Sequence, residues 1–140
     1  MSLVADVQTF LQEHSPPIVD GSTGWLSTRR RVHDQQHQIV VITEDGGLEP
    51  ETPAPDGSLG DSALKEPAVQ VRVRGEPWDG DGAEDKAQEI FAALHGLLRT
   101  DVGQTYCLRV KAQTAQPVFI GYDERNRPEF TISFRMLMPV

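Results

Sequence analysis

Apolar and polar positions alternate most regularly near the end of the chain. Large apolar residues occupy every second position there, at Phe130, Ile132, Phe134, Met136 and Met138. A period of two places these side chains on a core and the intervening ones on the opposite face, which predicts a long strand. An apolar run over 118–121 precedes it, separated by the polar segment 122–128. We therefore expect the chain to end in two strands around a polar turn.

Helical spacing of apolar residues occurs twice. Residues 2–13 form the first predicted helix, with Ser2 as its cap and a pair of prolines after its end. Residues 83–98 form the second, whose apolar stripe consists of Ala87, Ile90, Phe91, Leu94 and Leu98. Its other side carries Glu84, Asp85, Lys86 and Glu89. We expect the second helix to be the main packing element of the core.

Further strands are expected between and after the helices. The segment 38–43 is β-branched and apolar on both sides at its centre, which places it inside a sheet. Over 68–74 the pattern turns Val69, Val71 and Val73 inward and Gln70, Arg72 and Arg74 outward. Residues 105–113 are a further predicted strand, in which Tyr106, Leu108 and Val110 alternate with Cys107, Arg109 and Lys111. Residues 24–32 are also compatible with a strand.

The segment 44–67 differs in composition from the rest of the chain. Glycines and prolines interrupt it repeatedly, and acidic residues are scattered through it. This composition predicts a long mobile loop. Two interpretations remain open: an insertion that the fold tolerates, and an arm that becomes ordered on a partner.

These elements together predict an α+β fold. The order helix, two strands, helix and three strands favours a mainly antiparallel sheet with both helices packed on one face. The long loop over 44–67 would extend from it. A length of 140 residues is typical of one domain, so we expect a single domain over 1–140.

Composition narrows the function. The net charge of −8 disfavours binding to nucleic acid phosphates, although it suits a wall past which DNA slides. Cys107 is the single cysteine, so no intrachain disulfide can form, which fits a reducing compartment. The N-terminal segment lacks a basic leader, and no apolar run approaches the ~20 residues that span a bilayer. We expect a cytosolic protein without a membrane partner.

Candidate metal sites are weak. His33 and His37 have the spacing of two ligands on one helical turn, but the residues between them lack the glutamate of a zinc protease. Residues 79–82 resemble the start of a calcium loop that lacks its later ligands. They are more typical of a helix start, with Asp81 or Gly82 near the cap. We expect no metal and no cofactor.

A catalytic set is also missing from the sequence. Arg109 and Lys111 would lower the pKa of Cys107, yet no histidine lies near it in sequence. His95, at the end of the second helix, is expected to complement the helix dipole rather than to catalyse. No phosphate-binding glycine motif or nucleotide fingerprint occurs. We therefore expect that the protein is not an enzyme.

Three segments resemble a known family. AVQVRVRG at 68–75, DKAQEIFAALHGL at 85–97 and QPVFIGYDERNRPEFTISFRM at 116–136 occur in that order in phage minor capsid proteins of the tail-terminator type. Members from phages with long, non-contractile tails (siphovirus-like phages) are most similar, over residues 38–43 and 68–138. The combination of these motifs is more specific than any one of them.

The resemblance implies a structural protein of the virion. Members of this family form a ring, usually a homohexamer, on the last ring of the tail tube. The ring stops polymerisation of the tube and presents the surface that joins the filled head. The implied partners are other copies of this chain, the tail tube protein and a head–tail connector protein. DNA would pass through the lumen without specific binding, at the head-proximal end of a tail assembled in the host cytoplasm.

Basic residues are the candidates for subunit contacts. The cluster Arg29, Arg30 and Arg31 is either a solvated loop or a contact with an acidic surface of another copy. If a ring forms, the cations predicted on the outward faces of strands are further candidates: Arg72, Arg74, Arg109, Lys111 and Arg135.

Two alternatives are kept. A different head–tail connector, such as a head-completion or stopper protein, would share the location and the ring symmetry. A small α+β enzyme or ligand-binding domain would instead need a pocket, lined for example by Trp78, Tyr106 and His95.

Overall fold

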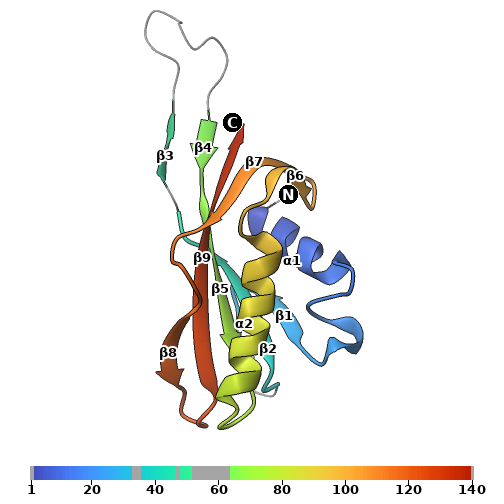
Figure 1. Cartoon of the computed structure of the whole chain (residues 1–140), viewed down its shortest axis with the longest axis vertical. Helices are drawn as coiled ribbons and strands as arrows, with labels where there is room; N and C mark the ends of the chain where they lie inside the picture. Colours follow the sequence, from blue (N-terminus) through green and yellow to red (C-terminus); the bar gives the residue numbers. More distant parts are fainter. Residues whose placement is uncertain (1, 33–35, 47, 52–63, 140) are drawn as a thin grey trace, which may run out of the picture.

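Two helices cover one face of a curled, mainly antiparallel sheet in the computed structural model of the chain (Figure 1). The structure describes residues 2–32, 36–46, 48–51 and 64–139. The helices are α1 (Leu3–Glu13), the short 3-10 helix η1 (Gly21–Thr23) and α2 (Gly80–Leu94). The strands are β1 (Leu26–Arg29), β2 (Ile39–Glu44), β3 (Leu48–Glu51), β4 (Leu64–Glu66), β5 (Ala68–Arg74), β6 (Leu98–Val102), β7 (Thr105–Ala112), β8 (Val118–Tyr122) and β9 (Pro128–Pro139). The predicted α+β class is confirmed.

Strand β9 is the central strand of the sheet, because four other strands pair with it. Along one edge β8 pairs with its first residues and β7 with residues nearer its end. Along the other edge β5 and then β4 pair with it, and β2 and β1 extend the sheet beyond β5. Strand β1 runs parallel to β2, while the other pairs are antiparallel. The interior position predicted for the segment 38–43 is confirmed.

The core lies between this sheet and the two helices. The predicted alternation of β9 is confirmed, since its large apolar side chains are all buried and face those of β5. Small residues on α2, Ala83 and Ala87, let the helix approach the sheet closely. Gly75 shows how close this approach is, because a Cβ atom at that position would lie 2.9 Å from the Cβ of Ala83. Burial of the apolar stripe is the main source of stability in such a layer.

The prediction of an unbroken loop over 44–67 is wrong at both of its ends. Strands β3 and β4 lie within this range and pair with each other, while residues 47 and 52–63 lie outside the described part. Strand β4 continues β5 in the same register along β9, interrupted at Pro67. Pro67 has no N–H, but its carbonyl still accepts a 2.9 Å hydrogen bond from Met136. The residues of β4 have little local preference for a strand, and they form one because β9, far away in sequence, pairs with them.

The second helix begins and ends earlier than predicted. Asp79 caps it, since its carboxylate accepts a 3.0 Å hydrogen bond from the N–H of Gly82, and Asp81 and Gly82 lie in the first turn, near the cap as predicted. The helix ends at Leu94, and Leu98 instead opens the unpredicted strand β6 with an exposed side chain. Lys86, predicted on the solvent side, is buried: its Nζ donates 2.8 Å to the carbonyl of Ile18. By contrast, the cap of α1 is the predicted Ser2.

The alternation predicted for β7 fails in its first half. Cys107 and Val110, three residues apart, are both buried, whereas Tyr106 is exposed. Opposite this half, Arg99 of β6 has a left-handed φ of 48° and turns the strand between Leu98 and Thr100. The break in the alternation of β7 thus lies opposite an irregular residue of its partner strand.

Candidate assembly surfaces

The predicted contact residues of β5 lie in a charged cleft of about 350 Å³. Its lining combines Val32 with cations and acids of β5 and of the turn before β9: Arg72, Arg74, Asp123, Glu124, Arg125, Arg127 and Glu129. The guanidinium of Arg72 holds the Glu129 carboxylate at 2.7 and 2.8 Å. Arg74, predicted to face outward, is instead buried and donates to the carbonyl of Gln36 at 2.6 Å. Both cations thus bind groups of the same molecule.

The turn before β9 is held by Asp123. Its carboxylate accepts hydrogen bonds from the N–H groups of Arg125 and Arg127, each at 2.9 Å, and from Nε of Arg127 at 2.7 Å. Burial acts to raise the pKa of Asp123, but the hydrogen bonds from Arg127 and Arg125 outweigh it and lower the pKa below its ordinary value. Arg127 is itself buried, so this pair is a structural clasp of the turn.

The basic cluster Arg29, Arg30 and Arg31 follows β1 on the surface. All three side chains are exposed. Nε of Arg30 holds the carboxylate of Glu44 at 2.7 and 2.8 Å, and hydrogen bonding to Arg30 lowers the pKa of Glu44. Arg29 and Arg31 have no ion pair within the described residues. These two cations therefore remain available to a partner.

A second group of predicted residues forms what we call the basic patch: Arg109, Lys111 and Arg135. Lys111 of β7 lies directly across from Arg135 of β9, and the two line a small hollow of about 130 Å³. Like charges in such a cross-strand pair repel each other. Arg109 reaches Glu66 of β4 at 3.2 Å, but Lys111 and Arg135 have no ion pair among the residues that the structure describes. An incoming acidic group would relieve this repulsion.

An exposed apolar surface was not anticipated from the sequence. We call it the apolar strip: Trp78, Val118, Phe119, Ile120 and Tyr122. Their side chains are 43–69% exposed, and they make up five of the eight large hydrophobic residues that are exposed in the described part of the chain. Among the strands that the structure describes, β8 pairs with β9 alone, so its second edge has no partner strand there. An unbroken apolar run at 118–120 was the signal in the sequence, since a half-buried strand would alternate.

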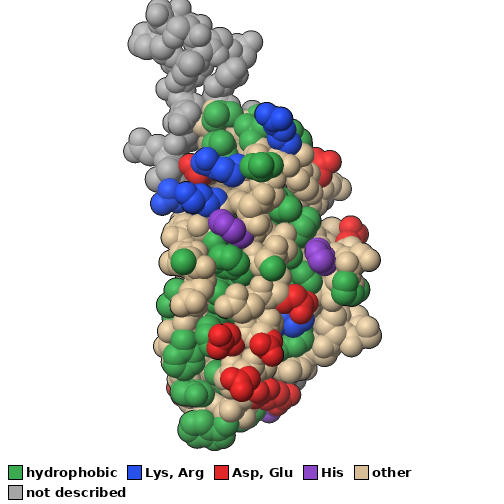
Figure 2. Space-filling model, in the orientation of Figure 1, with side chains coloured by type: hydrophobic (Ala, Val, Ile, Leu, Met, Phe, Trp, Pro, Cys, Tyr) green, Lys and Arg blue, Asp and Glu red, His purple; other side chains and the backbone are tan. Residues whose placement is uncertain are grey.

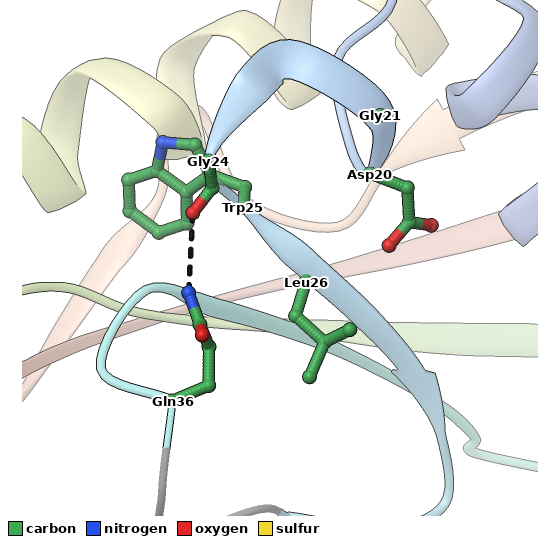
Figure 3. Close-up of a pocket in the computed structure, with 6 residues that line it drawn as sticks. All are labelled: Asp20, Gly21, Gly24, Trp25, Leu26 and Gln36. Atoms are coloured by element: carbon green, nitrogen blue, oxygen red, sulfur yellow. Dashed lines mark hydrogen bonds between the residues drawn. The ribbon is translucent and has the colours of Figure 1, made fainter.

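At the other edge of this part of the sheet, in β1, side chains bind the main-chain groups of Ser27. The N–H of Ser27 donates to Asp20 at 2.9 Å, and its carbonyl accepts from Gln8 at 3.3 Å. Asp20 also lines a hollow of about 240 Å³ next to Trp25, in which the amide of Gln36 reaches the carbonyl of Gly24 (Figure 3). The oxygens of Asp20 are occupied by hydrogen bonds from Ser27 and Gln12, so this carboxylate serves the edge of the sheet.

The residues considered for catalysis are placed differently from expectation. The predicted lowering of the Cys107 pKa is wrong: burial, followed by the charges of Asp6 and Asp101, raises it to about 11. Nδ1 of His95 accepts a 3.0 Å hydrogen bond from the N–H of Ala112, which ties the ring to strand β7. Trp78 precedes α2 and His95 follows it, so the length of the helix separates them.

Metal-binding clusters and membrane-spanning helices are not found in the described part of the chain. Within the described ranges no group of three or more potential metal ligands is present, and His33 lies outside those ranges. Neither α1 nor α2 has the length and apolar character that a membrane span requires.

Comparison with known proteins supplies the family. The family model described as bacteriophage tail terminator protein matches residues 25–138, from the last residue before β1 to the residue before the end of β9. The chain belongs to the bacteriophage tail terminator family. The resemblance seen in the sequence is confirmed, and it extends further towards the N-terminus than the motifs indicated. No curated protein matches the chain. Membership makes it a structural protein of the phage tail, and the basic patch and the apolar strip lie within the matched region.

Proposed function

We propose that this chain is the tail terminator of a phage with a long tail. In this proposal copies of the chain, six by likeness to the family, form a ring on the head-proximal end of the tail tube. The ring stops addition of tube subunits, and its outer face joins the head through a connector protein. Membership in the tail terminator family over most of the chain carries the proposal.

The surfaces of the chain suit assembly. Within the described residues strand β8 has one unpaired edge, whereas at the β1 edge side chains bind the main-chain groups of Ser27. Protein contacts are typically built on exposed aromatic residues and a charged rim. A net charge of −8 suits a ring through which DNA passes without adhering. No catalytic step enters this function.

The candidate contact residues divide into two groups. Lys111 and Arg135, together with Arg29 and Arg31, are the cations that we propose for contacts with other proteins. Arg30, Arg72, Arg74 and Arg109 already bind groups of their own molecule, so their role is proposed to be internal.

Removal of the gene from the phage tests the function. Tails are expected to grow beyond their normal length and to remain separate from filled heads, because nothing stops the tube. Electron microscopy measures tail length and attachment, and expression of the full chain from a plasmid should restore both. Tails of normal length that still join heads would contradict the proposal.

The position of the protein gives a second test and separates it from other connectors. An antibody to the chain, imaged on tails isolated without heads, should mark the head-proximal end of the tube. Labelling of isolated heads but not of isolated tails would indicate a head-completion or stopper protein instead.

A further inference from the structure

We propose that the apolar strip and the acidic start of α2 of one copy dock on the basic patch of the next copy. This contact would join the subunits of the ring, and it rests on the ring proposed above. The partner is a second copy of this chain, and the contact is heterologous, since two different surfaces meet.

The apolar strip has the properties of a prepared docking surface. Ring centroids lie 5.2 Å apart for Trp78 and Tyr122, 5.4 Å for Phe119 and Tyr122, and 5.2 Å for Phe119 and Phe130. Side chains that already pack against one another lose little rotamer freedom when a partner arrives. Trp and Tyr are also the residues that most often dominate the energy of an interface.

The open edge of β8 adds main-chain recognition. A strand edge offers unpaired N–H and C=O groups to another chain, and proteins usually cover or charge such an edge. Here Asp20 and Gln8 bind the outward N–H and C=O of Ser27 at the β1 edge, while β8 carries apolar side chains and, within the described residues, pairs on one side. This difference between two edges of one sheet indicates that β8 is left open for a partner.

Charge identifies the partner as another copy. The start of α2 presents Asp81, Glu84 and Asp85, all exposed and without an ion pair in the described part of the chain. A partner for this end must therefore combine cations with apolar surface. The same chain offers this combination in the basic patch, beside which Leu98 is 66% exposed and lies across from Arg109.

The two surfaces lie at opposite ends of the molecule. Strand β8 pairs with Pro128–Thr131 of β9, whereas β7 of the basic patch pairs with Phe134–Leu137. Figure 2 shows acidic side chains gathered at the lower end, hydrophobic ones along the lower edge, and basic ones near the upper end. Complementary surfaces at opposite ends cannot satisfy each other within one chain. They join copies head to tail, an arrangement that gives a ring when the rotation closes.

A charge swap tests this contact. The double variant Lys111→Glu with Arg135→Glu should abolish the ring, because acidic groups would then face the acidic start of α2. The double variant Asp81→Lys with Glu84→Lys should abolish it as well, because basic groups would then face the basic patch. The four substitutions together restore opposite charges and should restore the ring. Light scattering on the full chain, alone and mixed with tail tube protein, measures the mass.

A substitution in the apolar strip tests its other half. Ile120→Lys should convert rings to monomers, whereas Val32→Lys should not, although the two side chains are similarly exposed at 49% and 46%. Circular dichroism of the monomers must match that of the wild-type chain.

The outcomes separate this inference from the proposed function. A wild-type ring that survives Ile120→Lys, or a charge swap that fails to restore the ring, overturns the docking inference and leaves the terminator function standing. If Ile120→Lys keeps the ring but releases it from the tube, the strip binds the tube protein instead. A wild-type chain that stays monomeric both alone and in the presence of tail tube protein overturns the docking inference and the proposed function together.

Discussion

The backbone N–H of Trp78 donates a 2.8 Å hydrogen bond to the carbonyl of Asn126, and both residues have a left-handed φ of 62°. This bond joins the turn before α2 to the turn before β9. It holds the indole of Trp78 outside the core and against the ring of Tyr122. A left-handed backbone costs about 1–3 kcal/mol for a residue other than glycine, and such strain tends to occur at functional sites. Here it positions the most exposed aromatic residue of the apolar strip.

Substitution of Asn126 tests this backbone requirement. Asn126→Val should lower the free energy of unfolding by about 1–3 kcal/mol, because a β-branched residue is disfavoured at positive φ. Asn126→Gly should leave it nearly unchanged, since glycine adopts this conformation readily. Urea denaturation of both variants measures the difference. Equal stabilities for the two would show that the left-handed conformation at this turn is not needed.

The buried carboxylate of Asp6 should be important for stability. It lies on α1 and accepts hydrogen bonds from the N–H of Gln104 at 3.0 Å and from the hydroxyl of Thr105, so it ties the helix to the β6–β7 turn. Asp6→Ala should cost about 1–3 kcal/mol in the free energy of unfolding, because buried donors lose their partner. Asp81→Ala is a matched control on the exposed start of α2. A similar small effect for both would contradict this role of Asp6.

The same turn should not tolerate a side chain at Gly103. Its φ is 60°, and a Cβ atom there would lie 2.7 Å from the Cα of Asp6. Gly103→Ala should therefore destabilise the protein, whereas Gly80→Ala, with open space around it, should not. Thermal unfolding of the two alanine variants provides the comparison.

Acid should weaken the clasp at Asp123. Because the folded protein lowers the pKa of this group from 3.8, its contribution to stability is fully present above pH 3.8 and is lost as pH falls through the folded value. Asp123→Asn removes the charge that Arg127 binds, so the wild type should be more stable by about 1.5–3 kcal/mol at neutral pH. Denaturant titrations at several pH values should show this advantage shrinking below pH 3.8. A constant difference would contradict the assignment.

At high pH, ionisation of Cys107 should lower the stability of the protein. Its pKa is raised from 9.0 to about 11, so its effect on stability is constant below pH 9.0 and turns unfavourable as pH rises towards 11. Cys107→Ala should flatten the loss of stability in that range relative to the wild type. The thiol should also react slowly with iodoacetamide at neutral pH until the protein is unfolded in urea. Rapid alkylation of the folded chain would refute its burial.

Strands and helices with strong local periodicity could be predicted from the sequence. The alternation in β9 and β5 and the helical spacing of α1 identified these elements, because a period of two or 3.6 sorts side chains onto one face whatever they pack against. The ordered motifs from Ala68 onward identified the family for a similar reason, since they are local strings of residues. Short strands carry no such period. β4 is a strand because it hydrogen-bonds to β9, which comes much later in the chain. β6 is a strand because it hydrogen-bonds to β7, which follows it after a tight turn.

The sequence did not predict which charged side chains are buried. The pattern put Arg74 and Lys86 in solvent, yet both are buried because carbonyl groups of distant segments, at Gln36 and Ile18, accept their protons. The apolar run at 118–120 marked a strand but not its exposure, which depends on the strand that is missing from its second edge. By itself the sequence determined the periodic elements, the class of fold and the family. The tertiary structure alone decided which edge stays open and which charges stay unpaired, because both depend on contacts between residues far apart in the chain.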